Sequence, residues 1–335
     1  MIIGLTYDLK DDYISRGFSA EQAAEFDSIE TIEALESAIL ANGHDVVRIS
    51  NIHDLVKALA AGQSWDLVFN ICEGVSGIAR ESQVPALLEA YNIPYTFSAP
   101  EVLSITMDKS LAKTVVRDAG IPTAPWKVIR TPDDLDTSLL TYPLFLKPLA
   151  EGSSKGISEH SFVQNIEDAK KEAAFFLSRF SQPVLAESYL PGREFTVGIL
   201  GEGENASIIA VMEVNLDDQP DTFARSLANK DVDWTMPELF KLAYDPQAIR
   251  AGEIALASWK AIRGRDAGRV DLRCDANGTP NFMEVNPLPG LRPIYSDLPI
   301  LSELAGMPHV ELIGHIITHA MRRYGLHSTS LRKKA

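Results

Sequence analysis

Short apolar runs alternate with helix-like segments through residues 1–100 of the chain. Residues 2–6 form an apolar run of strand length, and residues 28–41 carry apolar side chains at helical spacing before an Asn-Gly pair. The pattern continues with a strand at 45–49, a helix at 53–61 and a strand at 66–70. This order predicts a parallel sheet with helices on its faces, as in a small Rossmann-like unit. Because no Gly-x-Gly-x-x-Gly turn follows the first strand, we expect no dinucleotide site there.

A change of pattern after residue 96 indicates a second unit. A helix is predicted from Met107-Asp108-Lys109 to residue 120, and 121–125 has the prolines of a linker. The apolar strand 143–148 carries Lys147, whose burial would require an anionic partner. A Gly/Ser-rich loop at 151–157 follows, and such a loop can place backbone N–H groups and hydroxyls around phosphate oxygens. Beyond it we predict a helix at 167–180 and strands at 183–187 and 193–200.

Two further strands, 268–273 and 281–287, flank the turn residues 275–278, so they predict an antiparallel hairpin. Since strand side chains alternate between faces, Arg269 and Asp271 project together, as do Glu284 and Asn286. One face then combines a guanidinium, two carboxylates and an amide. Oxygen ligands of this kind suit Mg²⁺. Taken alone, the same residues fit a solvated hairpin face equally well.

Composition narrows the possible number of domains, the binding partners and the cellular setting. The chain has 335 residues and 45% hydrophobic content, enough for two or three domains. Its net charge of −15 argues against nucleic acid as a partner. Cys72 and Cys274 match no metal or redox spacing and are interpreted as small buried hydrophobes in a reducing setting. With no leader-like start and no bilayer-length apolar run, a cytoplasmic protein without membrane contact is expected.

Five motifs together resemble the ATP-grasp superfamily and, within it, the D-alanine–D-alanine ligases. They match in order and approximate spacing over residues 66–300, and are Met107-Asp108-Lys109, Lys147-Pro148 with 151–154, 187–190 with 192–197, 268–271, and 284–286 with Pro289-Gly290. The resemblance implies an α/β protein with the ATP-grasp fold: a Rossmann-like N-terminal domain (1–100), then two α+β domains (101–190 and 191–325) that sandwich ATP, and a tail (326–335). It also implies an ATP-dependent ligase that forms C–N bonds through an acyl phosphate, as a homodimer.

Individual roles follow from the resemblance. The implied ATP contacts are Lys109, Lys147, Glu151, Ser153, Ser154, Glu187, Tyr189, Leu190, Glu194 and Lys230. Two Mg²⁺ ions, with Mn²⁺ as an alternative metal, would bind Asp271, Glu284 and Asn286. Arg269, the backbone N–H of Gly290 and Ser153 would act on the reacting groups. Amino-acid or other carboxylate substrates would contact Glu73, Arg292 and Ser296.

The chain departs from the family pattern around the amino-acid substrates. The family's N-terminal Glu, which receives the first ammonium, has no clean counterpart, so Glu25, Asp27 or Glu73 would have to replace it. The family's His-Gly loop is replaced by 70–74, and its lid differs from 217–234. We therefore expect a substrate pair other than two D-alanines. A true D-alanine–D-alanine ligase of peptidoglycan precursor synthesis and a catalytically weak nucleotide-binding regulatory protein are the alternatives. The basic end, from Arg322, is interpreted as a helix end and loose tail.

Overall fold

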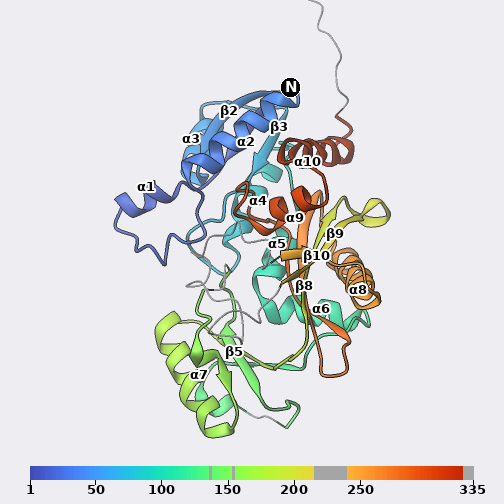
Figure 1. The fold of residues 1–335 in the computed structure, drawn as a ribbon. Coiled ribbons are helices and arrows are strands. Elements are labelled where there is room, and N and C mark those ends of the chain that lie inside the picture. Colours follow the sequence, from blue (N-terminus) through green and yellow to red (C-terminus); the bar gives the residue numbers. More distant parts are fainter. Residues whose placement is uncertain (136–137, 153–154, 215–239, 327–335) are drawn as a thin grey trace, which may run out of the picture.

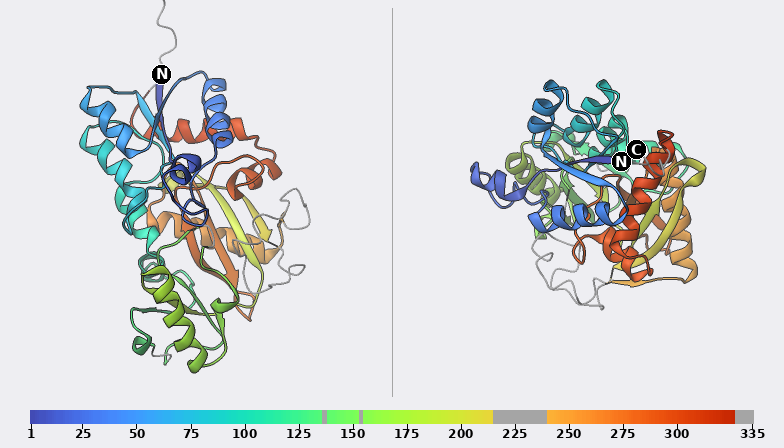
Figure 2. Two further views of the ribbon diagram at one scale, coloured as in Figure 1. Left: turned by 90° about the vertical axis from the view of Figure 1, so that its left-hand side faces the viewer. Right: turned by 90° about the horizontal axis from the view of Figure 1, so that it is seen from above.

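Three β-sheets are stacked along the molecule. The computed structural model describes residues 1–135, 138–152, 155–214 and 240–326. The sheet of the N-terminal residues lies at one end, a sheet built from residues 126–188 lies at the other, and the largest sheet lies between them (Figure 1). A view turned by a quarter about the long axis shows the same stack (Figure 2). Helices cover the sheets, in agreement with the predicted α/β class.

The N-terminal sheet is parallel, as predicted. Its strands are β1 (Ile2–Thr6), β2 (Asp45–Ser50) and β3 (Leu67–Asn70), in the order β2-β1-β3. Around it lie α2 (Ile29–Ala41), α3 (Ile52–Ala60), α4 (Gln83–Ala90) and, further out, α1 (Lys10–Ser15). The Asn51 side chain accepts hydrogen bonds from the first backbone N–H groups of α3, which starts that helix. The segment 70–82 leaves β3 at its carboxyl end and leads toward the other two sheets.

The second sheet is antiparallel and small. It contains β4 (Trp126–Ile129), β5 (Leu144–Pro148), β6 (Phe162–Val163) and β7 (Val184–Ser188), in the order β4-β7-β5-β6. Helix α7 (Ile166–Phe180) packs against it, and Phe176 is buried with the apolar residues of β5 and β7. Every residue of β5 is buried, so Lys147 enters the interior with its strand.

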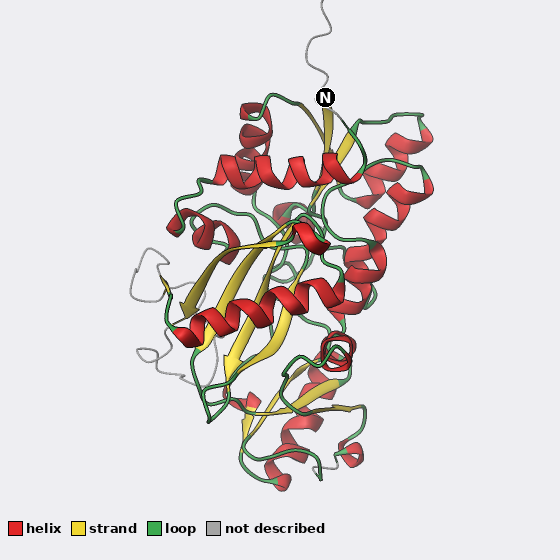
Figure 3. Cartoon of the chain, turned by 90° about the vertical axis from the view of Figure 1, so that its right-hand side faces the viewer, coloured by secondary structure: helices red, strands yellow, loops and turns green. Residues whose placement is uncertain are grey.

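The third sheet contains β8 (Glu194–Leu200), β9 (Ser207–Val214), β10 (Phe240–Leu242), β11 (Ala267–Cys274) and β12 (Pro280–Asn286). Its order is β10-β9-β8-β11-β12, and all neighbours are antiparallel. Helix α8 (Pro246–Ile262) lies across one face, where Trp259 is fully buried (Figure 3). The predicted hairpin is therefore the β11–β12 pair. Cys274 is buried at the end of β11, and Cys72 is buried in the N-terminal unit, as expected for both.

Four helices connect the sheets. Helices α5 (Pro100–Met107) and α6 (Lys109–Asp118) join the core of the third sheet, and α9 (Asp297–Leu304) packs on its β8 and β9. Helix α10 (His309–Arg323) packs against α2 of the N-terminal unit. Single-turn 3₁₀ helices occupy Arg80–Ser82, Pro132–Asp134, Glu159–Ser161 and Gly203–Asn205. Within the described ranges, no helix combines the length and apolar character needed to cross a bilayer.

Arg323, at the end of α10, shows that the sequence interpretation of the basic end was incomplete. Its guanidinium pairs with both carboxylate oxygens of Asp266, which is fully buried, and donates 2.9 Å to the carbonyl oxygen of Tyr95. Asp266 also accepts a 2.7 Å hydrogen bond from the backbone N–H of Phe97. Arg323 therefore joins the third sheet to the N-terminal unit. Residues 327–335 lie outside the described part of the chain.

Candidate active site

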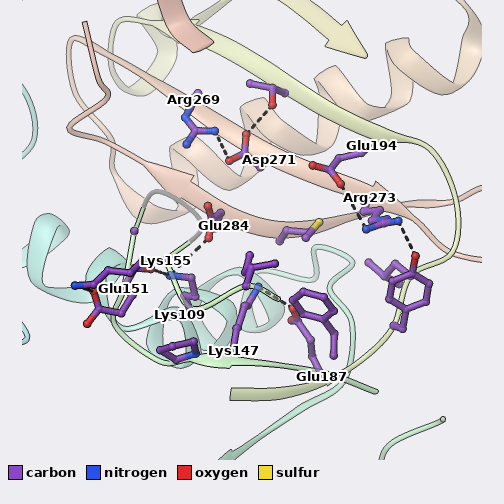
Figure 4. A pocket seen from close by; sticks show the side chains of 18 of the residues that line it. Lys109, Lys147, Glu151, Lys155, Glu187, Glu194, Arg269, Asp271, Arg273 and Glu284 are labelled. Atoms are coloured by element: carbon purple, nitrogen blue, oxygen red, sulfur yellow. Dashed lines mark hydrogen bonds and ion pairs between the residues drawn. The ribbon is translucent and has the colours of Figure 1, made fainter. Parts of the chain in front are cut away.

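A pocket lies between the second and third sheets. Its walls come from β5, β7 and the loop after β5 on one side, and from β8, β11 and β12 on the other. Its cavity volume is about 100 Å³. Lys109 and Lys147 face Arg269 and Asp271 across it (Figure 4). Seven of the ten expected nucleotide contacts and two of the three expected metal ligands line this pocket, although they are separated by up to about 175 positions along the chain.

The β11–β12 hairpin supplies one wall. Arg269 pairs with Asn286 across the two strands, and Asp271 pairs with Glu284. A register shift follows Asp271, so the strand irregularity lies next to these side chains. Arg269, Asp271 and Glu284 line the pocket, and the Asn286 amide nitrogen lies 3.4 Å from an Asp271 carboxylate oxygen. The predicted common face of the hairpin is confirmed.

Asp271 has a dense set of neighbours. The Thr196 hydroxyl donates to it at 2.9 Å, and Arg269 donates to its other oxygen at 2.6 Å. Arg269 also pairs with Asp297 at 3.1 Å. Burial raises the pKa of Asp271 to about 7, and the carboxylates of Glu284 and Asp297 act in the same direction, against Arg269. Two or three clustered carboxylates of this kind would be stabilised by an added cation.

Glu187 lines the pocket with Lys147 and is paired with two lysines. Lys147 Nζ lies 2.8 Å from one oxygen of Glu187, and Lys113 Nζ lies 2.9 Å from the other. Lys113 also donates to the Thr123 hydroxyl at 2.8 Å and is fully buried. Glu187 is thus an anionic partner of the buried Lys147, as the burial of this lysine requires. Sequence reasoning missed Lys113, although it lies one helical turn after Lys109 on α6 and so shares its face.

Lys109 lies at the start of α6, where the Asp108 side chain caps the helix. Its ammonium donates to the carbonyl oxygen of Glu151 and lies 3.7 Å from Glu284. The Glu151 carboxylate pairs with Lys155 at 2.8 Å and accepts 2.6 Å from the Gln182 amide. These contacts hold the visible parts of the Gly/Ser loop beside the pocket. Ser153 and Ser154, and the expected lid with Lys230, lie outside the described residues.

The opposite end of the pocket is lined by Tyr189, Leu190 and Glu194. Arg273 connects two of them: its guanidinium donates to the Tyr189 hydroxyl at 2.8 Å and lies 3.5 Å from Glu194. The same guanidinium lies over the Tyr189 ring, 4.8 Å from the centroid. Arg273 lies on β11, opposite Glu194 of β8. Its role in positioning Tyr189 and Glu194 is evident only from the folded structure.

A second hollow, which we call the substrate cavity, opens on the other side of Arg269. Its volume is about 200 Å³, and it is lined by the three predicted substrate residues Glu73, Arg292 and Ser296, by the predicted catalytic Gly290 and by the predicted metal ligand Asn286. A Cβ at Gly290 would lie 2.8 Å from the Ser296 hydroxyl oxygen, so a larger residue here would displace the Ser296 side chain. Both hollows share Gly152 and Arg269, which places them side by side.

Carboxylates from the N-terminal unit line the substrate cavity. Glu25 is engaged within the protein: it pairs with Arg80 at 2.8 Å and accepts 2.9 Å from the Gly152 N–H. Burial raises the pKa of Asp27 to about 7 and, with Glu81 nearby, raises that of Glu73. No hydrogen bond or ion pair of the Glu73 side chain occurs within the described structure. Glu81 lines the same cavity and has a pKa raised to about 8 by burial, and the Arg80 charge opposes the raised pKa of both Glu73 and Glu81.

Comparisons with known proteins agree with this geometry. The family model "D-ala D-ala ligase C-terminus" matches residues 115–318. D-alanine–D-alanine ligase of Aquifex aeolicus is 30% identical over 294 residues, which are 87% of this chain and 94% of that protein. An uncharacterized protein y4sG of Sinorhizobium fredii is 32% identical over 262 residues, 77% of this chain and 75% of that one.

The fold agrees as well. The crystal structure of D-alanine–D-alanine ligase from Bacillus anthracis complexed with ATP matches with a TM-score of 0.72 and 22% identity, over 97% of this chain and 99% of that chain. The family model covers more than half of the chain, and the Aquifex relative is similar over nearly its whole length. The chain therefore belongs to the D-alanine–D-alanine ligase family of ATP-grasp ligases.

Proposed function

We propose that this ligase joins the carboxylate of one small molecule to the amine of another through an acyl phosphate, with a preferred pair other than two D-alanines. The observation that carries the proposal is the position of Arg269. It lies between a pocket with lysines and carboxylates and a cavity suited to amino acids. A phosphoryl group and a substrate carboxylate could thus meet at its guanidinium.

The side chains that line the first pocket have the chemistry needed to bind ATP. Lys109, Lys147 and Lys155 supply positive charge around it, and charged donors of this kind bind phosphate oxygens strongly. Tyr189 and Leu190 offer a partly apolar wall for the adenine, and Glu194 offers a carboxylate for ribose hydroxyls. Ser153, Ser154 and Lys230 remain expected phosphate contacts from the family resemblance alone.

The hairpin fits Mg²⁺. Asp271, Glu284 and Asn286 provide two carboxylates and an amide beside the lysines. In the described ranges, no three His, Cys, Asp or Glu side chains gather as a protein-only metal cage. Mg²⁺ typically uses one or two carboxylates together with substrate phosphates, so this donor set suits it. When bound, the metal would neutralise charge on the phosphates.

The chemistry has two steps. A substrate carboxylate oxygen attacks the γ-phosphorus of ATP, and ADP leaves to give an acyl phosphate. The amine of the second substrate, after losing a proton, attacks the acyl carbon, and inorganic phosphate leaves as the amide forms. Arg269 and the Gly290 N–H would stabilise the oxyanion at the second step. These groups can act only if both substrates are held, which the substrate cavity would do.

Glu73 is our candidate for the first substrate's ammonium. Glu25 already has Arg80 and Gly152 as partners, whereas the Glu73 side chain makes no hydrogen bond or ion pair with a described residue, although the Arg80 charge acts on it. The positive charge of an ammonium beside Glu73 would oppose the effect of burial, which raises the pKa of this carboxyl group. Arg292 and Ser296, on the opposite wall, suit a substrate carboxylate.

The test is a screen of amino-acid pairs with the purified protein. ATP, Mg²⁺ and all pairs of D- and L-amino acids are supplied, and ADP release and products are measured. We expect the best pair to exceed D-alanine alone by at least tenfold in kcat/KM. Selective, efficient synthesis of D-alanyl-D-alanine would favour the true ligase of peptidoglycan precursor synthesis. Tight nucleotide binding without ADP release from any pair would favour the regulatory alternative.

A further inference from the structure

A groove leads away from the substrate cavity toward the second sheet. Its volume is about 600 Å³. Lys10, Ala24 and Tyr295 line both the groove and the substrate cavity, so the two hollows adjoin. We call it the aromatic groove after four of its lining residues, Phe175, Phe176 and Phe180 of α7 and Tyr295. Phe176 is itself fully buried, so it supports the groove rather than exposing its ring. Its size alone falls within the range of small-molecule sites.

The walls of the aromatic groove are largely apolar in character. The Phe175 side chain is 40% exposed and that of Tyr295 is 38% exposed. The Phe176 and Phe180 rings are stacked, with centroids 6.1 Å apart. The charged groups at the rim already have partners: Arg179 lies 3.0 Å from Glu21, and His160 lies 2.8 Å from Glu172. Apart from Lys10 at the junction, an occupant therefore meets rings and charges that are already paired.

The junction between the two hollows has a different chemistry. Lys10 is half-buried there, and its ammonium makes no hydrogen bond or ion pair with any described residue. The Arg292 guanidinium lies over the Tyr295 ring, 4.9 Å from the ring centroid. Two cations at the mouth of an apolar groove suit an amino acid whose carboxylate stays at the junction while its side chain enters the groove.

We propose that the aromatic groove binds a large apolar side chain of the amino acid that supplies the amine. This inference rests on the ligase function proposed above. The amine substrate is chosen because Tyr295 at the junction adjoins Arg292 and Ser296, the groups suited to that substrate's carboxylate. The methyl group of alanine leaves such a groove unfilled. Burial of a leucine or phenylalanine side chain would raise kcat/KM about 10- to 100-fold over alanine.

The first experiment varies the amine substrate. The best carboxylate substrate from the screen is held constant, alanine, leucine, phenylalanine and tryptophan of both chiralities are compared, and mass spectrometry identifies the product. We expect at least a tenfold higher kcat/KM for a large apolar amine substrate, with that residue at the amine-derived position. Equal or better use of alanine, or a large residue only at the acyl position, would overturn the inference while ligase activity stands. Absence of ADP release from every pair would instead refute the proposed function.

Variants supply the second experiment. Ala24→Phe fills the junction, so the ratio of kcat/KM for the large substrate to that for alanine should fall at least tenfold. Phe175→Ala removes an exposed ring and should lower the same ratio about fivefold. Ala60→Phe, at an exposed position of α3, is the matched control and should leave the ratio unchanged. Thermal unfolding checks that each variant folds, and if Ala24→Phe does not fold, an unchanged ratio in Phe175→Ala is sufficient to reject the groove.

Discussion

Lys147 Nζ lies 2.8 Å from Oε1 of Glu187, while Lys113 occupies the other oxygen of the same carboxylate. Two buried ammonium groups thus share one carboxylate, and only Lys147 lines the nucleotide pocket. The excess positive charge beside the pocket suits a phosphate group. Substituting each lysine in turn can therefore show which one binds a ligand and which one is structural.

We predict that Lys147→Met weakens ATP binding by about 10- to 100-fold, because a charged hydrogen bond to phosphate contributes about 1.5–3 kcal/mol. Lys113→Met removes the other partner of Glu187 without altering the pocket lining, and should change ATP affinity less than threefold. Isothermal titration with ATP measures both. Equal effects of the two substitutions would make Lys147 a structural residue.

The metal assignment predicts that Glu284→Gln and Asp271→Asn each lower ADP formation at least 100-fold while the protein stays folded. Each change removes a negative oxygen ligand beside the phosphates. A coupled ADP assay over a range of Mg²⁺ concentrations measures the effect. Glu253→Gln, at an exposed site on α8, is the control. Near-native turnover in both test variants would exclude these carboxylates as ligands.

The acid dependence of stability should report on Glu187. Burial alone raises its pKa, but the charges of Lys113 and Lys147 outweigh burial and lower it to about 2 from 4.5. A lowered folded-state pKa stabilises the protein above the unfolded pKa, and the gain is lost as the pH falls from about 4.5 to 2. Its size is about 3 kcal/mol. Denaturant unfolding should show the stability advantage over Glu187→Gln shrinking across this window; a constant difference would contradict the shift.

Arg323 provides a test of the connection between α10 and the third sheet. Arg323→Met leaves Asp266, which is fully buried, without its cation and should lower the free energy of unfolding by about 3–5 kcal/mol. Arg322→Met, on the exposed neighbour, should change it by less than about 0.5 kcal/mol. Urea unfolding of the two variants makes a matched comparison. Similar values would show that the pair adds little.

Sequence patterns by themselves determined the local elements and the family. The spacing of apolar residues located β1, α2, β5, α7 and the β11–β12 hairpin. Helices and strands repeat at fixed periods, so the spacing of their buried side chains can be recognised in the sequence. Strand alternation also placed Arg269, Asp271, Glu284 and Asn286 on one face. These predictions need only neighbouring residues, and the structure confirms them.

The tertiary structure decided which charged side chains pair with one another. Glu187 meets Lys113 and Lys147, Asp266 meets Arg323, and Glu25 meets Arg80, all between segments far apart in the chain. A charge in a sequence does not show which opposite charge neutralises it, since the choice depends on how the sheets and helices pack. The position of the aromatic groove beside the substrate cavity has the same origin. The walls of the groove come from the N-terminal segment, α7 and the loop before α9, which only the folded chain brings together.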